Sequence, residues 1–242
     1  MNVKILHFYP DLMSLYGSYA NVSILRRTLE QMGNTVTVEQ VAPRAAADCA
    51  DADVIYVGAG TERAQKAALA DLLRYAPALK AAAERGAVLI FVGSAMDLLG
   101  RSITDRAGKA YEALGLADFT AVQGAERYVE DVYGHTDLFD AAVVGFMNKC
   151  SSIHGVTTPL LQTMAMGYGN DGPRAAEGYH ERSVFASQLT GPLLVKNPEL
   201  LKVIVRAVYT ERKEQMPEIP VDRYMAQGYA ITAEQLRLRS EK

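Results

Sequence analysis

Few side chains in this sequence could act as a nucleophile with a base beside it. The 242 residues include two cysteines and four histidines. Ser94 follows an apolar run at residues 88–92, and Cys150 precedes His154 by four positions. A serine or cysteine nucleophile needs a base within hydrogen-bond reach. Ser94 and the pair Cys150/His154 are therefore the candidates for nucleophilic catalysis.

Ser94 lies at a candidate nucleophile elbow. Residues 88–92 predict a fully buried parallel strand, and a helical pattern of apolar residues begins at Met96. The small pair Gly93-Ser94 joins them, as in the tight strand-to-helix turn that presents a reactive side chain at the top of a sheet. Two interpretations are open: Ser94 is a displaced nucleophile, or the elbow residues are small for packing. We favour packing.

Cys150 and His154 would share one face if they lay on a helix. Ser151-Ser152 and the strand predicted before them favour a loop instead. A catalytic pair and an ordinary loop thiol are both open, and the loop thiol is favoured.

The sequence predicts neither a metal site nor a bound cofactor. No spacing of His, Cys and Asp matches a zinc site, and no Gly-x-Gly-x-x-Gly or Walker pattern occurs. Gly58-Ala59-Gly60 follows a predicted strand, and its backbone N–H groups could stabilise an oxyanion.

The elements that position these residues alternate between strand and helix. Strands are predicted at residues 3–8, 35–41, 54–57 and 88–92. Helices are predicted at residues 21–31 and 63–85, the second with a kink near Pro77. This order predicts an α/β fold of three layers, with a mostly parallel central sheet and helices on both faces. Ligands of such sheets bind at the carboxyl ends of the strands.

The second half predicts shorter strands, and then a helix at residues 198–212. Residues 216–242 predict a polar tail with a last helix from Thr232. We therefore expect one domain, residues 1–215, followed by a C-terminal helical tail, residues 216–242.

The composition is that of a globular protein that works in the cytoplasm. The formal net charge is −3, which argues against a nucleic-acid surface. The longest apolar runs are far shorter than the roughly 20 residues that span a bilayer. The N-terminus lacks the shape of a signal peptide, and two cysteines make no disulfide framework.

Seven short motifs carry a family resemblance over residues 5–200. They are YPDLMSLYG (9–17, with Asn21 after it), GAGTERAQ (58–65), LLG (98–100), GFMN (145–148), GYGN (167–170), EG (177–178) and GPLLVKNP (191–198). With these motifs the chain resembles the class I glutamine amidotransferases of the cobyric-acid-synthase-like branch. Within that branch it is similar to the glutaminase subunits of lipid II isoglutaminyl synthase. The resemblance implies a flavodoxin-like class I amidotransferase fold.

The resemblance also implies a chemistry. In this family an elbow cysteine attacks the side-chain amide of glutamine, a histidine moves the proton, and ammonia passes to a partner synthetase. In the isoglutaminyl synthases that partner is Mur-ligase-like and uses ATP to activate a carboxylate of a peptidoglycan precursor.

Both catalytic positions of the family hold other residues in this chain. Counting back from residues 98–100, the cysteine falls on Gly93; counting back from residues 191–194, the histidine falls on Thr190. Glycine offers no nucleophile, and threonine cannot accept and return a proton near neutral pH. The resemblance thus implies a degenerate subunit that is retained as the non-catalytic partner of a Mur-ligase-like synthetase in cell-wall precursor amidation.

The resemblance also implies a substrate pocket, for glutamine or another small molecule. Its expected residues are Gly58, Ala59, Gly60, Ser94, Asp97 and Arg127. Asp97 stands where the family has a glutamine, and its charge would repel the α-carboxylate of the substrate. Arg127 matches a family arginine at the active site.

The rival function is an active glutaminase or hydrolase that supplies ammonia through relocated residues. Ser94 or the pair Cys150/His154 would then carry the reaction.

Overall fold

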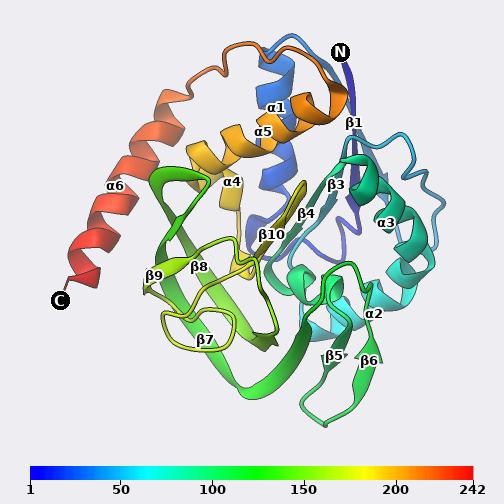
Figure 1. Ribbon diagram of the computed structural model, residues 1–242, viewed down its shortest axis with the longest axis vertical. Coiled ribbons are helices and arrows are strands. Elements are labelled where there is room, and N and C mark those ends of the chain that lie inside the picture. The colour runs from blue at the N-terminus through cyan, green and yellow to red at the C-terminus, as the bar shows by residue number, and fades with distance from the viewer. Residues whose placement is uncertain (242) are drawn as a thin grey trace.

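A first, mostly parallel sheet forms the centre of the molecule (Figure 1). The computed structural model describes residues 1–241. The strand order is β10-β11-β4-β3-β1-β2, and β10 pairs antiparallel with β11 while the other pairs are parallel. The strands are β1 Asn2–Phe8, β2 Thr35–Val41, β3 Val54–Val57, β4 Val88–Val92, β10 Tyr179–Glu181 and β11 Val184–Ser187. The order 2-1-3-4 places a topological switch point between β1 and β3, where ligands of such sheets bind.

Helices cover both faces of this sheet, which confirms the predicted three-layer α/β fold. They are α1 Ala20–Gln31, α2 Glu62–Leu72, α3 Ala76–Arg85, α4 Leu193–Lys196 and α5 Pro198–Arg212. Alternate residues of a strand point to opposite faces: Ile5 of β1 packs in the core under α1 and α5, and Leu6 packs in the core under α2 and α3. Both cores are apolar, and β3 and β4 are buried along their whole length.

The helix predicted at residues 63–85 is two helices. A 3-10 turn at Leu73–Tyr75 separates α2 from α3, and Pro77 lies in the first turn of α3. Proline is harmless there because the first N–H groups of a helix have no intrahelical partner. The chain therefore breaks before Pro77 and does not kink at it.

A second sheet packs beside the first and forms one wall of the candidate site. Its order is β12-β8-β7-β5-β6, with β9 on β7. The strands are β5 Ser102–Thr104, β6 Ala110–Glu112, β7 Thr120–Thr136, β8 Phe139–His154, β9 Thr163–Met166 and β12 Leu189–Thr190. The register of β7 against β8 shifts between Gln123 and Tyr128, and this bulge carries Arg127. Cys150 and His154 lie inside β8, so the predicted loop is wrong: pairing with β7 extends the strand over the two serines.

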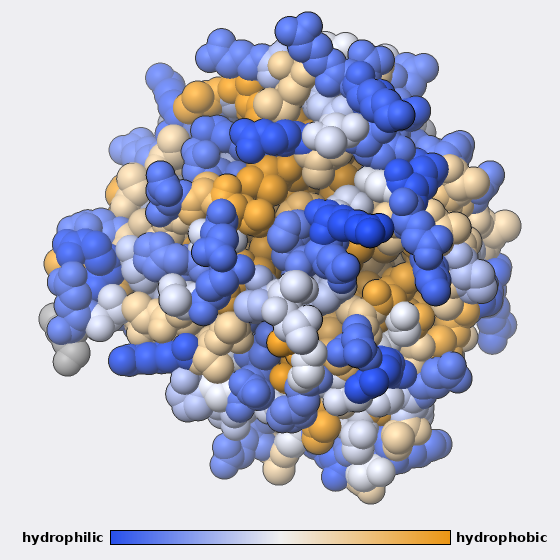
Figure 2. All heavy atoms as spheres, viewed as in Figure 1, coloured by the Kyte–Doolittle hydropathy of each residue, from blue (hydrophilic) through white to orange (hydrophobic). Residues whose placement is uncertain are grey.

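The last helix, α6 Arg223–Ser240, begins nine residues before the predicted Thr232. Asp222 caps it by accepting hydrogen bonds from the N–H groups of Tyr224 and Met225. The helix lies against β7 and β8 (Figure 1), and the Tyr229 hydroxyl donates to the Ala142 carbonyl at 2.7 Å. Figure 2 shows polar residues over most of this face and apolar residues gathered over α5, beside α6. No helix within residues 1–241 is long and apolar enough to cross a membrane.

Asn21 joins the start of α1 to the segment that follows β12. Its amide donates to the carbonyl of Ser18 (3.0 Å), the hydroxyl of Tyr56 (3.1 Å) and the carbonyl of Gly191 (3.1 Å). Its Oδ1 accepts from the N–H of Leu194 at 2.8 Å. All of these bonds are buried, so Asn21 fixes the position of Thr190, just before Gly191.

We predict that Asn21→Ala lowers the free energy of unfolding by about 2–4 kcal/mol, because it leaves several buried polar groups without partners. Urea denaturation measures this. Ser23→Ala, on the exposed side of the same helix, should change stability by less than about 0.5 kcal/mol. Equal losses in the two variants would refute the bridging role.

Candidate functional site

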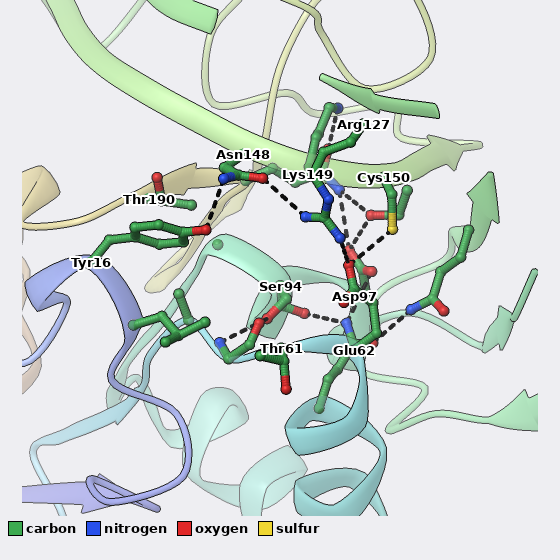
Figure 3. A pocket seen from close by; sticks show the side chains of 18 residues that line it. Tyr16, Thr61, Glu62, Ser94, Asp97, Arg127, Asn148, Lys149, Cys150 and Thr190 are labelled. Atoms are coloured by element: carbon green, nitrogen blue, oxygen red, sulfur yellow. Dashed lines mark hydrogen bonds and ion pairs between the residues drawn. The ribbon is translucent and has the colours of Figure 1, made fainter. Parts of the chain in front are cut away.

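A cavity of about 260 Å³ opens where the carboxyl ends of β3 and β4 face β8. Among the predicted site residues it gathers Ala59, Gly60, Gly93, Ser94, Asp97, Arg127, Cys150 and Thr190 (Figure 3). Two predicted residues lie outside its lining. Gly58 packs against the Met13 carbonyl, and a Cβ built on Gly58 would lie 2.3 Å from that carbonyl oxygen. His154 is exposed and borders a second hollow, which Cys150 also lines.

Gly93 and Thr190 lie close together, as the two members of a catalytic pair would. A Cβ built on Gly93 lies 3.5 Å from the Thr190 methyl carbon and only 2.6 Å from the Ala59 Cβ. The backbone of Gly93 is left-handed, with φ +61°, a conformation that is uncommon for residues other than glycine. The elbow geometry is present, but Ala59 fills the space that a side chain at position 93 would need.

Ser94 ties the elbow to the loop after β3. Its hydroxyl accepts from the Gly60 N–H at 2.9 Å and donates to the Gly60 carbonyl at 2.8 Å. The Ala59 N–H donates to the Ser18 hydroxyl at 3.3 Å. The N–H groups of Ala59 and Gly60, which we expected to be available to an oxyanion, are therefore engaged within the protein. Through its two bonds to the backbone of Gly60, Ser94 has a structural role.

Thr190 also turns its hydroxyl away from the elbow. The hydroxyl donates to the Phe146 carbonyl at 3.1 Å, within the pairing of β12 and β8. The methyl group consequently points toward Gly93.

Five side chains form a connected series along the cavity, which we call the rim chain (Figure 3). Asn148 donates to the Tyr16 hydroxyl at 2.8 Å, and Arg127 donates to the Asn148 Oδ1 at 2.9 Å. Arg127 also forms an ion pair with Glu62. The Cys150 thiol donates to the Glu62 carboxylate at 3.1 Å. The rim chain thus joins the β1–α1 loop, β7, β8 and α2.

Cys150 is hydrogen-bonded to the rim chain, and His154 is not part of it. Residues four apart on a strand are roughly 13 Å apart, and the Cys150 thiol contacts Glu62 instead of an imidazole. Burial, and then the hydrogen bond to Glu62, raise the pKa of Cys150, which disfavours the thiolate that a nucleophile requires. The Cys150 thiol is therefore hydrogen-bonded to Glu62 and not to His154.

The floor of the cavity is a buried polar network around Asp97. Its carboxylate is 1% exposed and accepts hydrogen bonds from Gln65 (3.0 Å), Ser151 (3.1 Å) and Gln188 (3.1 Å). Burial raises the pKa of Asp97, whereas these donors and the nearby Lys149 act in the opposite direction. Asp97 is thus compensated inside the protein, in contrast to the expected unpaired charge facing a substrate.

Lys149 is the buried cation of this floor, and the sequence reasoning missed it. Its ammonium donates to the Gly169 carbonyl and to Gln188 Oε1. Burial lowers the pKa of Lys149 to about 8, although Glu177 and Asp97 oppose the shift. Glu177 is fully buried and accepts from Ser187 Oγ at 2.9 Å. The alternation of side chains along a strand could have indicated Lys149, because residues 149 and 151 of β8 point to the same face and both line the cavity. Within residues 1–241, no group of three or more His, Cys, Asp or Glu side chains could hold a metal ion.

We predict that Lys149→Met lowers the free energy of unfolding by about 3 kcal/mol near neutral pH, because it leaves two buried carboxylates without a cation. Without Lys149, the folded-state pKa values of Asp97 and Glu177 lie still further above their unfolded values. Stability is then lost as pH rises, so the cost should be larger at about pH 7 than at about pH 5. Denaturant unfolding at both pH values measures it.

Lys202→Met is the matched control, since Lys202 forms a partly exposed ion pair with Glu199. Its cost should stay below about 1 kcal/mol. A Lys149→Met variant that is as stable as this control would contradict the role of Lys149.

The sequence matches a known protein family over most of its length. A family model, the CobB/CobQ-like glutamine amidotransferase domain, matches residues 4–198. The chain belongs to this family. Of the six residues expected for the substrate pocket, all except Gly58 line the cavity at the ends of β3 and β4.

Two curated relatives are similar over most of their length. Both are named lipid II isoglutaminyl synthase (glutamine-hydrolyzing) subunit GatD. The Streptococcus pneumoniae protein is 28% identical over 90% of this chain and 85% of its own. The Staphylococcus aureus protein is 28% identical over 87% of this chain and 86% of its own.

Solved structures confirm the amidotransferase fold. PurLQS from Thermotoga maritima matches with a TM-score of 0.53 and 15% identity, over 87% of this chain and 99% of that one. The glutaminase domain of Trypanosoma brucei CTPS with bound acivicin matches with a TM-score of 0.53 and 11% identity, over 91% of this chain and 98% of that one.

Proposed function

We propose that this chain is a non-catalytic glutamine amidotransferase-like subunit, and that it partners a Mur-ligase-like, ATP-dependent synthetase in cytoplasmic amidation of a cell-wall precursor. One observation carries the non-catalytic part: Gly93 and Thr190 stand face to face at the elbow, and neither can do nucleophile or base chemistry. The similarity to two GatD subunits supports the place in lipid II amidation.

Ser94 does not supply the missing nucleophile. Hydrolysis of an amide by this route needs an attacking atom, a base beside it, and donors aimed at the developing oxyanion. The Ser94 hydroxyl is bonded to both backbone groups of Gly60, so the same contact removes a nucleophile and an oxyanion donor. The cavity then serves to bind a small molecule, and the subunit acts through its partner.

The second candidate is an active hydrolase. The observation in its favour is that the Cys150 thiol lines the same cavity and contacts a carboxylate, Glu62, that could accept its proton.

Ammonia release from L-glutamine separates the two functions. We expect the chain, alone or with its synthetase, to stay at the background rate, and Ser94→Ala, Cys150→Ala and His154→Ala to change nothing. The Staphylococcus aureus GatD relative serves as the positive control. Turnover in the wild type that one of these substitutions abolishes would sink the non-catalytic proposal.

Partner binding is a separate test. A tagged chain should co-purify with a Mur-ligase-like protein from its own cells, and the two purified proteins should form a complex at micromolar concentration. Absence of a complex between them would count against the synthetase partner while leaving the loss of catalysis in place.

The contact with Ala59 predicts what restoring the catalytic pair requires. Gly93→Cys with Thr190→His should remain inactive, because the new Cβ would lie 2.6 Å from the Ala59 Cβ. Adding Ala59→Gly removes that contact, and adding Ser94→Gly frees the Gly60 N–H. Ammonia release above background is expected only in the variants that carry these additions.

Circular dichroism and thermal unfolding would show that each restored variant is folded. Activity in the double variant alone would show that Ala59 is no obstacle and that the present geometry adapts to a cysteine.

A further inference from the structure

We propose that the cavity binds a small molecule with a carboxylate at one end and an apolar group at the other, in place of an amide-bearing one. This inference rests on the proposed function, because it concerns the ligand of the same cavity. A volume of about 260 Å³ lies just below the usual range for ligand pockets, and it suits a molecule the size of an amino acid.

The elbow side of the cavity is apolar. Its lining there consists of Leu15, the Cβ of Ala59, the Cα of Gly93 and the methyl group of Thr190. The Thr190 hydroxyl, which is the polar atom of that side chain, is directed to the Phe146 carbonyl. A ligand group that reaches the elbow therefore meets carbon atoms.

Two backbone donors on this side are also engaged within the protein. The Gly60 N–H is held by Ser94 Oγ at 2.9 Å, and the Ala59 N–H by Ser18 Oγ at 3.3 Å. A side-chain amide placed here would lose its bonds to water without gaining these. A buried polar group without a partner costs about 1–3 kcal/mol, so an amide is selected against.

The other side of the cavity offers a guanidinium. Arg127 lies across from Thr190 in Figure 3, and its side chain is 38% exposed. A guanidinium presents its donors in a planar fork that matches a carboxylate. The carboxylate now on it belongs to the protein: Glu62, at the start of α2, forms the ion pair. A ligand carboxylate must therefore compete with Glu62 for Arg127.

The charged groups on the floor of the cavity already have partners within the protein. Asp97 accepts hydrogen bonds from three donors, and Lys149 is bonded to Gly169 and Gln188. Arg127, whose carboxylate partner Glu62 is 35% exposed, is thus the charged group best placed to exchange that carboxylate for one of a ligand.

Isothermal titration of the full chain with two isosteric amino acids tests this proposal. L-Homoleucine has nearly the shape of L-glutamine, because two methyl groups take the places of the amide oxygen and the amide nitrogen. We expect L-homoleucine to bind about tenfold more tightly than L-glutamine, given the cost of an unpaired amide. Arg127→Gln should weaken both amino acids by about tenfold.

Two further substitutions act on the two ends separately. Ser94→Ala frees the Gly60 N–H and should shift the affinity ratio toward L-glutamine by about threefold or more. Glu62→Gln removes the internal competitor and should tighten both amino acids by about two- to fivefold, with the ratio unchanged. Glu234→Gln is the matched control, because Glu234 also pairs with an arginine, Arg237, but lies on α6; it should change neither affinity.

Three outcomes overturn the proposal: tighter binding of L-glutamine, no effect of Arg127→Gln, or no binding of L-homoleucine up to about 10 mM even in Glu62→Gln. These outcomes are distinct from failure of the proposed function. L-Homoleucine has no amide to hydrolyse, so its binding and the release of ammonia from L-glutamine are independent measurements.

Discussion

The close approach of two backbones at the ends of β3 and β4 is the constraint on which the site depends. Ser94 bonds to both the N–H and the carbonyl of Gly60, which brings Ala59 against the left-handed Gly93. Because only a residue without a Cβ fits there, the elbow cannot present a side chain. The same two bonds remove a hydroxyl and a backbone donor from the cavity. The contact between Ser94 and Gly60 thus excludes a nucleophile at the elbow and also weakens oxyanion stabilisation.

The cavity persists because its other supports do not depend on the elbow chemistry. Asn21 holds the segment after β12 by buried hydrogen bonds. Asp97 and Lys149 form a floor whose polar groups are satisfied within the protein. Burying such charges is costly unless they are bonded, so this network specifies one arrangement of β8 against the first sheet. The shape and the polar floor of the cavity therefore do not depend on the side chains at the elbow.

The family assignment and the site together illustrate how fold and function separate. The matched domain over residues 4–198 includes Gly93 and Thr190, the positions where the resemblance implies the catalytic pair, so sequence similarity alone would assign glutamine hydrolysis. The geometry supports the proposed binding role, since Gly93 and Thr190, which can act as neither nucleophile nor base, face each other at the elbow. The rim chain from Tyr16 to Cys150 is a feature of this chain's own side chains, and it places Glu62 on the guanidinium that a ligand would use.

The sequence by itself determined the parallel α/β core and the position of the elbow, and it placed Gly93 and Thr190 where the resemblance implies a cysteine and a histidine. Apolar strands such as residues 88–92 and glycine at position 93 are local signals, and they were sufficient. Local signals misplaced Cys150 and His154, because strand β8 is extended by pairing with β7, residues distant in sequence. They also could not show that Ser94 is engaged, that Asp97 is compensated by Lys149, or that Glu62 reaches Arg127. Each of these depends on side chains from separate elements meeting in space, which only the tertiary structure decides.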